Sequence, residues 1–321
     1  MIRSSRRPIS NVSLSSVMGH GGMGIFPYIL FPTFWVLIYT AWKTNTLIIA
    51  KSATRYDRVG NCIWWNPWTW RFVHFIKDKK SILNAFGLTN PGVFICAIQI
   101  RIACMLGFNV VPSFFIDFSK GYMRGRKEVL EAMHICKRVL GKYFRVMELN
   151  PSCPNSGESI SSNQRNVLEV FKILRQRFPN ITFIIKGSIV YPKEFYFQLE
   201  QAGANIIHTM NTIPFDVAVE LGISPYGKSP LGEKTKGGFS GELTKKDALR
   251  YAITTVIPAT TIPLIFGCGI SSYADILSYK NALLENKRDK REFSCIICTA
   301  AAYDPRNIAK LIKELNCREN I

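Results

Sequence analysis

The sequence is poor in acidic residues and in histidine. Its 321 residues contain 22 Asp and Glu against 41 Lys and Arg, so the formal net charge is +19. Such a surface attracts nucleic acid, anionic lipid headgroups, acidic proteins or phosphorylated small molecules, and the charge alone does not choose among them. The histidines are scattered without a cluster of other metal ligands, so we expect no metal site. These histidines are His20, His74, His134 and His208.

The sequence also lacks a disulfide framework. Its nine cysteines are odd in number and scattered through hydrophobic segments, which is typical of a protein in the reducing cytoplasm. Cys295 and Cys298 form a C-x-x-C pair, but they lie in the β-like run FSCIICTA without a second pair of ligands. This pair therefore predicts a core strand rather than a metal site.

No uninterrupted apolar run predicts a membrane span. Residues 24–42 carry no charge over about the length of a span, but Pro27 and Pro32 interrupt them. Pro32 instead suits the first turn of a helix from Thr33 to Lys43. The basic start MIRSSRRP is followed by a polar stretch, so we expect no signal peptide.

No internal repeat or low-complexity tract is present, and the chain alternates short β-rich runs with longer helical patterns. This rhythm is typical of parallel strands joined by crossover helices. The expected helices span residues 33–43, 162–178, 192–203, 244–257 and 271–286. The expected strands lie within residues 11–17, 46–52, 110–118, 142–150, 181–188, 204–211, 262–269 and 293–300. Eight such strands predict an α/β fold, a closed (β/α)₈ TIM barrel that forms a single domain over residues 1–321.

One insertion, around residues 60–80, is rich in tryptophan. Trp64, Trp65, Trp68 and Trp70 lie within seven residues of one another. So much aromatic surface predicts a segment that packs over the barrel mouth or contacts a partner, with packing in the core as the alternative.

Polar residues follow several of the expected strands directly. Lys51, Asn150, Lys186, Asn211 and the glycines Gly267 and Gly269 all stand at carboxyl ends of strands. A barrel of this type carries its active site at that end, so these residues predict a functional site rather than ordinary turns.

The most reactive candidate in this set is Cys153, in the loop NPSCPN. A cysteine there could act as a nucleophile, a metal ligand or a general base. No histidine is placed to serve a nucleophile and no ligands cluster for a metal. Lys51 and Lys186 would stabilise a thiolate, so the role of base fits best.

The asparagines add a substrate class. Asn84, Asn150, Asn155 and Asn211 each offer a donor and an acceptor, which suits a ring with alternating carbonyl and N–H groups such as a pyrimidine. The late turns FGCGIS and CTAA, with Thr299, could bind a phosphate through backbone N–H groups.

Several motifs together resemble the dihydroorotate dehydrogenase family. ELNPSCPN resembles its catalytic loop, AKSATRYDRVGN its Lys-Ser loop, and NAFGLTNPG its substrate loop. IIKGS, MNT and GGFSGE match further family motifs in the same order, across nearly the whole chain. The family's Gly-x-Gly-Gly-Ile reads Phe-Gly-Cys-Gly-Ile here, and its late Gly-Thr pair reads Cys298-Thr299, so side chains stand where a phosphate would approach the backbone.

The resemblance implies an FMN enzyme that oxidises dihydroorotate to orotate in pyrimidine synthesis. Cys153 would be the base that removes a proton while a hydride passes to the flavin. The implied substrate-binding residues are Lys51, Asn84, Gly87, Leu88, Asn150, Asn155, Asn211 and Thr212. The implied FMN-binding residues are Ser16, Lys51, Ser52, Asn150, Lys186, Met210, Gly241, Cys268, Gly269, Cys298 and Thr299.

A cysteine base is similar to the soluble class 1 members, whereas the membrane-bound class 2 members use serine. The ten or so residues before the first strand are too few for the quinone-binding extension of class 2. Electrons would pass to a soluble acceptor such as fumarate, or through a partner subunit to NAD, and a homodimer is one assembly that the resemblance allows.

Three alternatives stay open at this point. One is another flavin pyrimidine oxidoreductase, similar to dihydropyrimidine dehydrogenase. A second is a tRNA dihydrouridine synthase, although no RNA-binding helical domain follows the barrel and we do not expect nucleic acid as a partner. The third is a barrel that has lost FMN and serves as a basic binding protein.

Overall fold

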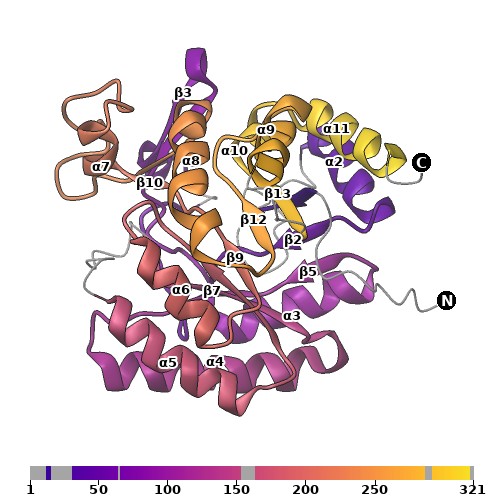
Figure 1. The fold of residues 1–321 in the computed structure, drawn as a ribbon, viewed down its shortest axis with the longest axis vertical. Coiled ribbons are helices and arrows are strands. Elements are labelled where there is room, and N and C mark those ends of the chain that lie inside the picture. Colours follow the sequence, from indigo (N-terminus) through magenta and orange to yellow (C-terminus); the bar gives the residue numbers. More distant parts are fainter. Residues whose placement is uncertain (1–11, 16–30, 64–65, 153–162, 286–290, 319–321) are drawn as a thin grey trace.

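Nine short strands form one parallel sheet in the computed structural model, which describes residues 12–15, 31–63, 66–152, 163–285 and 291–318 (Figure 1). Every pairing in this sheet is parallel, and its order is β5-β2-β1-β13-β12-β9-β8-β7-β6. The strands are β1 (Val12–Leu14), β2 (Leu47–Ile49), β5 (Asn109–Val111), β6 (Ser113–Phe115), β7 (Val146–Asn150), β8 (Thr182–Lys186), β9 (Ile206–His208), β12 (Leu264–Phe266) and β13 (Phe293–Ile297).

The sheet closes into a barrel through a strand that Pro112 divides. β5 pairs with β2 and β6 pairs with β7, yet only Pro112 separates β5 from β6 in the chain. Proline has no N–H to donate, while its carbonyl still accepts a 2.9 Å hydrogen bond from the backbone N–H of Glu148. The two halves therefore act as one barrel strand, and the prediction of eight strands and a TIM barrel is confirmed.

Helices connect the strands and surround the barrel (Figure 1). They are α2 (Pro32–Lys43), α3 (Gly92–Met105), α4 (Tyr122–Leu140), α5 (Gln164–Arg177), α6 (Lys193–Gln201), α7 (Phe215–Glu220), α8 (Lys245–Tyr251), α9 (Tyr273–Glu285), α10 (Thr299–Tyr303) and α11 (Pro305–Arg318). All five expected helices form. α2 begins with Pro32 in its first turn as predicted, and α8 continues into a π-helical segment, Ala252–Val256. Over the described ranges, no helix has both the length and the apolar character needed to cross a bilayer.

A second, antiparallel sheet was not expected from the sequence. It joins β3 (Val73–Ile76) and β4 (Ser81–Asn84) to β10 (Ile213–Pro214) and β11 (Gly238–Gly241), in the order β10-β11-β4-β3. Its strands come from the segments that follow β2 and β9. They are short, and β11 is half glycine, so no strong strand pattern marks them in the sequence.

The tryptophan-rich insertion contains β3, the first strand of this antiparallel sheet. Its residues Pro67–Phe72 make a 3₁₀ helix that leads into β3. Trp68 is 87% exposed and Trp70 is 52% exposed, so packing in the core is wrong for these two side chains. Trp64 and Trp65 lie outside the described residues.

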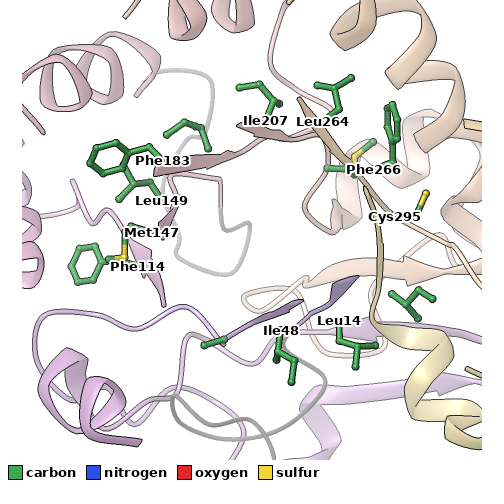
Figure 2. Packing of buried hydrophobic residues seen from close by; sticks show 14 of the residues in the cluster. Leu14, Ile48, Phe114, Met147, Leu149, Phe183, Ile207, Leu264, Phe266 and Cys295 are labelled. Atoms are coloured by element: carbon green, nitrogen blue, oxygen red, sulfur yellow. The ribbon is translucent and has the colours of Figure 1, made fainter. Parts of the chain in front are cut away.

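Two hydrophobic layers flank the barrel strands, as the alternation of side chains requires. Figure 2 shows Leu14, Ile48 and Phe183 pointing away from the ring of strands, into the layer beneath the helices. The strand residues that alternate with them form a second cluster inside the barrel. This inner cluster consists of Leu47, Ile49, Val111, Ile184, Ile206, Ile265 and Ile296. An apolar plug thus fills the barrel below its carboxyl end.

The outer layer allows a stability test at Phe183. This side chain is fully buried and packs edge-on against Phe171 of α5, with ring centroids 5.5 Å apart. We expect Phe183→Ala to lower the free energy of unfolding by about 3–5 kcal/mol, because it leaves a cavity between sheet and helix. Phe197→Ala, at a side chain that is 55% exposed on α6, should change it by less than about 0.5 kcal/mol. Urea unfolding followed by circular dichroism measures both, and equal losses would contradict the layer assignment.

Candidate active site

A large cavity opens at the carboxyl ends of the barrel strands. Its volume is about 1580 Å³, above the roughly 300–1,000 Å³ of most small-molecule pockets. The predicted site residues that line it are Lys51, Ser52, Asn84, Leu88, Asn150, Lys186, Met210, Asn211, Thr212, Gly241, Cys268, Gly269, Cys298 and Thr299. The structure therefore brings together residues that are up to 248 positions apart in the chain, from Lys51 to Thr299.

Among the other predicted residues, Gly87 is described and does not itself line the cavity. Gly87 precedes the lining residue Leu88 in a turn where both have positive φ, 68° and 60°. Ser16, Cys153 and Asn155 lie outside the described residues.

Strand register explains why the polar side chains meet. Asn150 and Lys186 end the neighbouring strands β7 and β8, and Lys186 is level with His208 of β9. Side chains two residues apart on a strand share a face, so Glu148 points to the same side as Asn150. The upper end of the barrel interior is consequently polar, directly above the apolar plug.

The amides of the cavity floor are held by hydrogen bonds. Asn150 Nδ2 donates to Ser52 Oγ at 2.9 Å, and Asn211 Nδ2 donates to Asn150 Oδ1 at 3.2 Å. Asn211 Oδ1 accepts from the backbone N–H of Thr212 at 2.9 Å. These bonds fix which end of each amide faces the cavity.

The start of the NPSCPN loop is anchored in the same network. The carbonyl oxygen of Pro151 accepts a hydrogen bond from Tyr191 Oη at 3.2 Å. Ser152 Oγ donates to the carbonyl oxygen of Gly187 at 2.9 Å, and the Ser152 carbonyl accepts from Asn211 Nδ2 at 2.9 Å. These three hydrogen bonds hold the chain in place up to Ser152, the residue that precedes Cys153.

A buried pair, Glu148 and His208, lies beneath these amides and was missed by the sequence analysis. Glu148 Oε2 is 2.7 Å from His208 Nδ1, and Glu148 Oε1 accepts from Ser113 Oγ at 2.7 Å. Burial opposes the charge on Glu148, but Lys186 and the hydrogen bonds from His208 and Ser113 outweigh it, so the pKa of Glu148 lies below its usual value. Glu148 stands two residues before Asn150 on one strand, and this spacing could have indicated that both side chains point toward the site.

The histidine of this pair is neutral. Burial, followed by the effect of Lys186, lowers the pKa of His208 below its usual value in spite of the nearby carboxylate. Because Glu148 is ionised, the Nδ1 atom of His208 carries the proton and donates it to Glu148. His208 also lines the cavity, so a neutral imidazole forms part of its floor.

The far end of the cavity is built from backbone turns and small polar side chains. The turns that hold Gly241 and Gly269 both require positive φ, 102° and 80°, and they pack together so closely that a Cβ on Gly269 would lie 2.8 Å from the Gly241 carbonyl oxygen. Asp275 holds the loop after β12 by accepting hydrogen bonds from the backbone of Ser271 and Ser272, each at 2.9 Å. The Gly269 turn follows β12, the seventh barrel strand, and the Gly241 turn ends β11 of the antiparallel sheet, while Cys298 and Thr299 follow β13, the eighth barrel strand. The positions after the seventh and eighth strands are those predicted for a phosphate.

Apolar and aromatic groups form the remaining wall. Lys51 Nζ lies 4.7 Å from the ring centroid of Phe86, and Leu88 packs on Phe115. Cys295 is buried in β13 as predicted, whereas Cys298 lines the cavity. Within the ranges that the structure describes, no group of three His, Cys, Asp or Glu side chains could hold a metal ion.

The sequence is similar to known dihydroorotate dehydrogenases. Residues 36–282, more than half of the chain, match the family model described as dihydroorotate dehydrogenase. The catalytic subunit of dihydroorotate dehydrogenase B (NAD(+)) from Pyrococcus abyssi is 28% identical over 216 residues, which is 64% of this chain and 64% of that protein. The corresponding subunit from Porphyromonas gingivalis is 25% identical over 239 residues, 72% of this chain and 69% of that protein.

A relative whose name gives a different electron acceptor, fumarate, is similar to this chain to nearly the same degree. Dihydroorotate dehydrogenase A (fumarate) from Lactobacillus delbrueckii subsp. bulgaricus is 26% identical over 214 residues, 63% of this chain and 63% of that protein. The matched stretch thus spans less than two thirds of the length of the Pyrococcus and Lactobacillus proteins.

The fold is shared with solved structures of the same name. A ligand-free DHODH from Eimeria tenella superposes with a TM-score of 0.63 at 12% sequence identity, covering 96% of this chain and 83% of that one. At this identity the likeness concerns the barrel fold alone.

The Glu148–His208 pair predicts a pH dependence of stability. Since the pKa of His208 is lower in the folded state than its ordinary value of about 6.5, the unfolded chain takes up a proton first as the pH falls. The stabilisation is therefore complete above about pH 6.5 and is lost below it, with a slope of at most about 1.4 kcal/mol per pH unit for this one proton. We expect His208→Gln to flatten this part of the profile.

Urea unfolding of both proteins between pH 7.5 and pH 5, in steps of about half a unit, measures the effect. His134→Gln is the matched control, because His134 lies outside the cavity and packs edge-on against Phe178. If His208→Gln and His134→Gln alter the slope equally, the buried pair is not its source.

Proposed function

The chain belongs to the dihydroorotate dehydrogenase family, and on that premise we propose that it catalyses the FMN-dependent oxidation of dihydroorotate to orotate in pyrimidine synthesis. The observation that carries this proposal is the convergence of the family motifs on one cavity, where Lys51 and three asparagines line the same space. The family match is the reason to prefer this reaction over those of other flavin pyrimidine oxidoreductases. In this proposal residues 1–321 act as one barrel domain.

The donor set of the cavity fits FMN. Its volume exceeds that of most single-ligand pockets, which suits a flavin nucleotide together with a pyrimidine. We assign the phosphate to the end formed by Gly241, Gly269, Cys268, Cys298 and Thr299, where two backbone turns and a hydroxyl lie close together. Cysteine is small, so contacts through backbone N–H groups survive the two departures from the family's glycines.

Other predicted residues would hold the rest of the cofactor. Lys51, Ser52, Asn150 and Met210 line the cavity, and Ser16 is assigned from the sequence alone. Lys186 would stand near the polar edge of the flavin ring, where a positive charge favours the reduced anion. When bound, FMN would supply the acceptor for the hydride.

The asparagine network would orient the substrate ring. Asn150 donates one of its two amide protons to Ser52 Oγ, which fixes the orientation of the amide. Asn84, Asn155, Asn211 and Thr212 would complete the contacts to carbonyl and N–H groups of the pyrimidine, beside Gly87 and Leu88. Lys51 would pair with the substrate carboxylate, which explains a cation at this position.

Cys153 would act as the base. The thiolate would take a proton from one ring carbon while the neighbouring carbon gives up a hydride, so the ring gains a double bond and loses two electrons. The anchors at Pro151 and Ser152 support this role, since a base must be held within reach of one carbon atom.

The names of the relatives support two electron acceptors. Named relatives use either NAD(+) or fumarate, so we propose that electrons leave the flavin to fumarate or, through a partner subunit, to NAD. We place the protein in the cytoplasm, where its many free thiols would stay reduced. A homodimer is the assembly we propose for the isolated chain.

Flavin reduction tests the reaction directly. The purified chain should be yellow, and its flavin absorbance should bleach when dihydroorotate is added without oxygen. Dihydrouracil, which lacks the carboxylate, should bleach it at least about tenfold more slowly, because the ion pair between Lys51 and the substrate carboxylate is then not formed. A colourless protein that also fails to bind added FMN would refute the proposal.

Substitutions at Cys153 test the base. Cys153→Ala and Cys153→Ser should both retain FMN but reduce it more slowly by about 10²–10⁴-fold, the usual contribution of a general base. Stopped-flow absorbance under anaerobic conditions gives this rate. Cys104→Ala, at a thiol that contacts the backbone of Val110, is the control and should keep the wild-type rate. A wild-type rate in Cys153→Ala would rule out proton abstraction by this thiol.

A further inference from the structure

Helices α2 and α3 expose an unusual amount of apolar surface. Trp35 is 55% exposed and Met105 is 63% exposed, and the exposed side chains recur at helical spacing along both helices. We call this surface the α2–α3 face. It consists of Phe31, Trp35, Tyr39 and Trp42 on α2 and its N-cap, and of Phe94, Ile95, Ile98, Ile102, Met105 and Leu106 on α3 and its C-cap.

The C-terminal ends of the two helices are joined by a hydrogen bond. Trp42 Nε1, at the end of α2, donates a 3.0 Å hydrogen bond to the carbonyl oxygen of Leu106, at the end of α3. The strands that follow these two helices, β2 after α2 and β5 after α3, are also hydrogen-bonded neighbours. The exposed apolar side chains at the C-terminal ends of the two helices therefore lie close to one another.

Other helices around the barrel differ in this respect. α4 carries the surface ion pair Arg124–Glu128, and α5 carries Arg165–Glu169. α3, by contrast, has Arg101 as its one charged residue and is apolar on nearly every side. A helix with that composition is normally covered by apolar material all round.

The two helices and the chain segments that flank them carry charge of one sign. The sequence contains no Asp or Glu before Asp57, nor any between Asp78 and Asp117, so both helices and their flanking segments lack acidic residues. Lys43 ends α2 beside Trp42, and Arg101 lies on α3. The whole chain carries a formal charge of +19.

We propose that the α2–α3 face binds the surface of an anionic lipid bilayer. Tryptophan and tyrosine side chains prefer the level of the headgroups, and isoleucine, leucine and methionine side chains bury in the adjoining acyl region. The basic residues and the absence of acidic ones match anionic headgroups. The helices lie on the bilayer and do not cross it. This binding is independent of the reaction proposed above.

A lipid surface suits this face better than a protein partner. Protein interfaces contain about one hydrogen bond per 100–200 Å² and a rim of mixed charges. On α3 the longer polar side chains are Gln99 and Arg101, and Arg101 already donates to the carbonyl oxygen of Val139. A bilayer needs no such specific partners, only apolar area and attraction between opposite charges.

Vesicle sedimentation of the full-length chain tests the proposal. The chain should bind vesicles of phosphatidylcholine with about 30% phosphatidylserine, and binding should weaken from about 0.1 M to about 1 M salt. The triple substitution Ile98→Gln, Ile102→Gln and Met105→Gln should lower the partition coefficient roughly tenfold or more. Lys43→Glu should lower it by a smaller factor.

The matched control places the same three glutamines on exposed apolar positions elsewhere, as Phe197→Gln, Ile253→Gln and Leu284→Gln. It should bind as the wild type does. If the α3 triple variant does not fold, Trp35→Phe provides the test, because brominated lipid should quench the tryptophan fluorescence of the wild type more than that of this variant.

Three results would overturn the proposal. One is equal binding of both triple variants. Another is equal binding of the wild type to pure phosphatidylcholine and to anionic vesicles. The third is a dimer in light scattering that the α3 substitutions convert to a monomer, without vesicle binding by either form, because the face would then join two copies of the chain.

Discussion

The buried carboxylate of Glu148 is the constraint on which the candidate site depends. A charge inside a barrel is costly unless it is paired and hydrogen-bonded. Here Ser113 and His208 donate to its two oxygens, and Lys186 lies close enough to lower its pKa. The carboxylate therefore requires these three side chains at the upper end of the barrel interior, above the apolar plug.

From Glu148 the network extends to the cavity. Ser113 Oγ is 2.8 Å from Ser52 Oγ, which accepts from Asn150, which in turn accepts from Asn211. Hydrogen bonds in such a chain polarise one another in a low-dielectric interior, and each orients the next donor. The amides that would recognise a pyrimidine are thus oriented by the charge of Glu148, through Ser113 and Ser52. Because they are already ordered, substrate binding would cost little conformational entropy at these side chains.

Much of this could be predicted from the sequence, and the failures have physical reasons. The eight strands and the residues at their ends were predictable because strand alternation and motifs are local properties. His208 was not recognised because its partner lies 60 positions away, on a strand that is not its direct neighbour in the sheet. The antiparallel sheet was missed because its four short strands are stabilised by one another and not by their own composition. Trp68 and Trp70 were open to two interpretations because exposure depends on what the rest of the fold leaves uncovered.

By itself the sequence determined the barrel, the family and fourteen of the residues that line the cavity, because each of these depends on short-range pattern and motif order. Only the tertiary structure decided which of these residues touch. It showed that Pro112 divides a strand yet leaves the barrel closed, since a carbonyl can still accept where an N–H is absent. It also showed that α2 and α3 leave many apolar side chains exposed, because burial is a property of the assembled molecule and not of a segment.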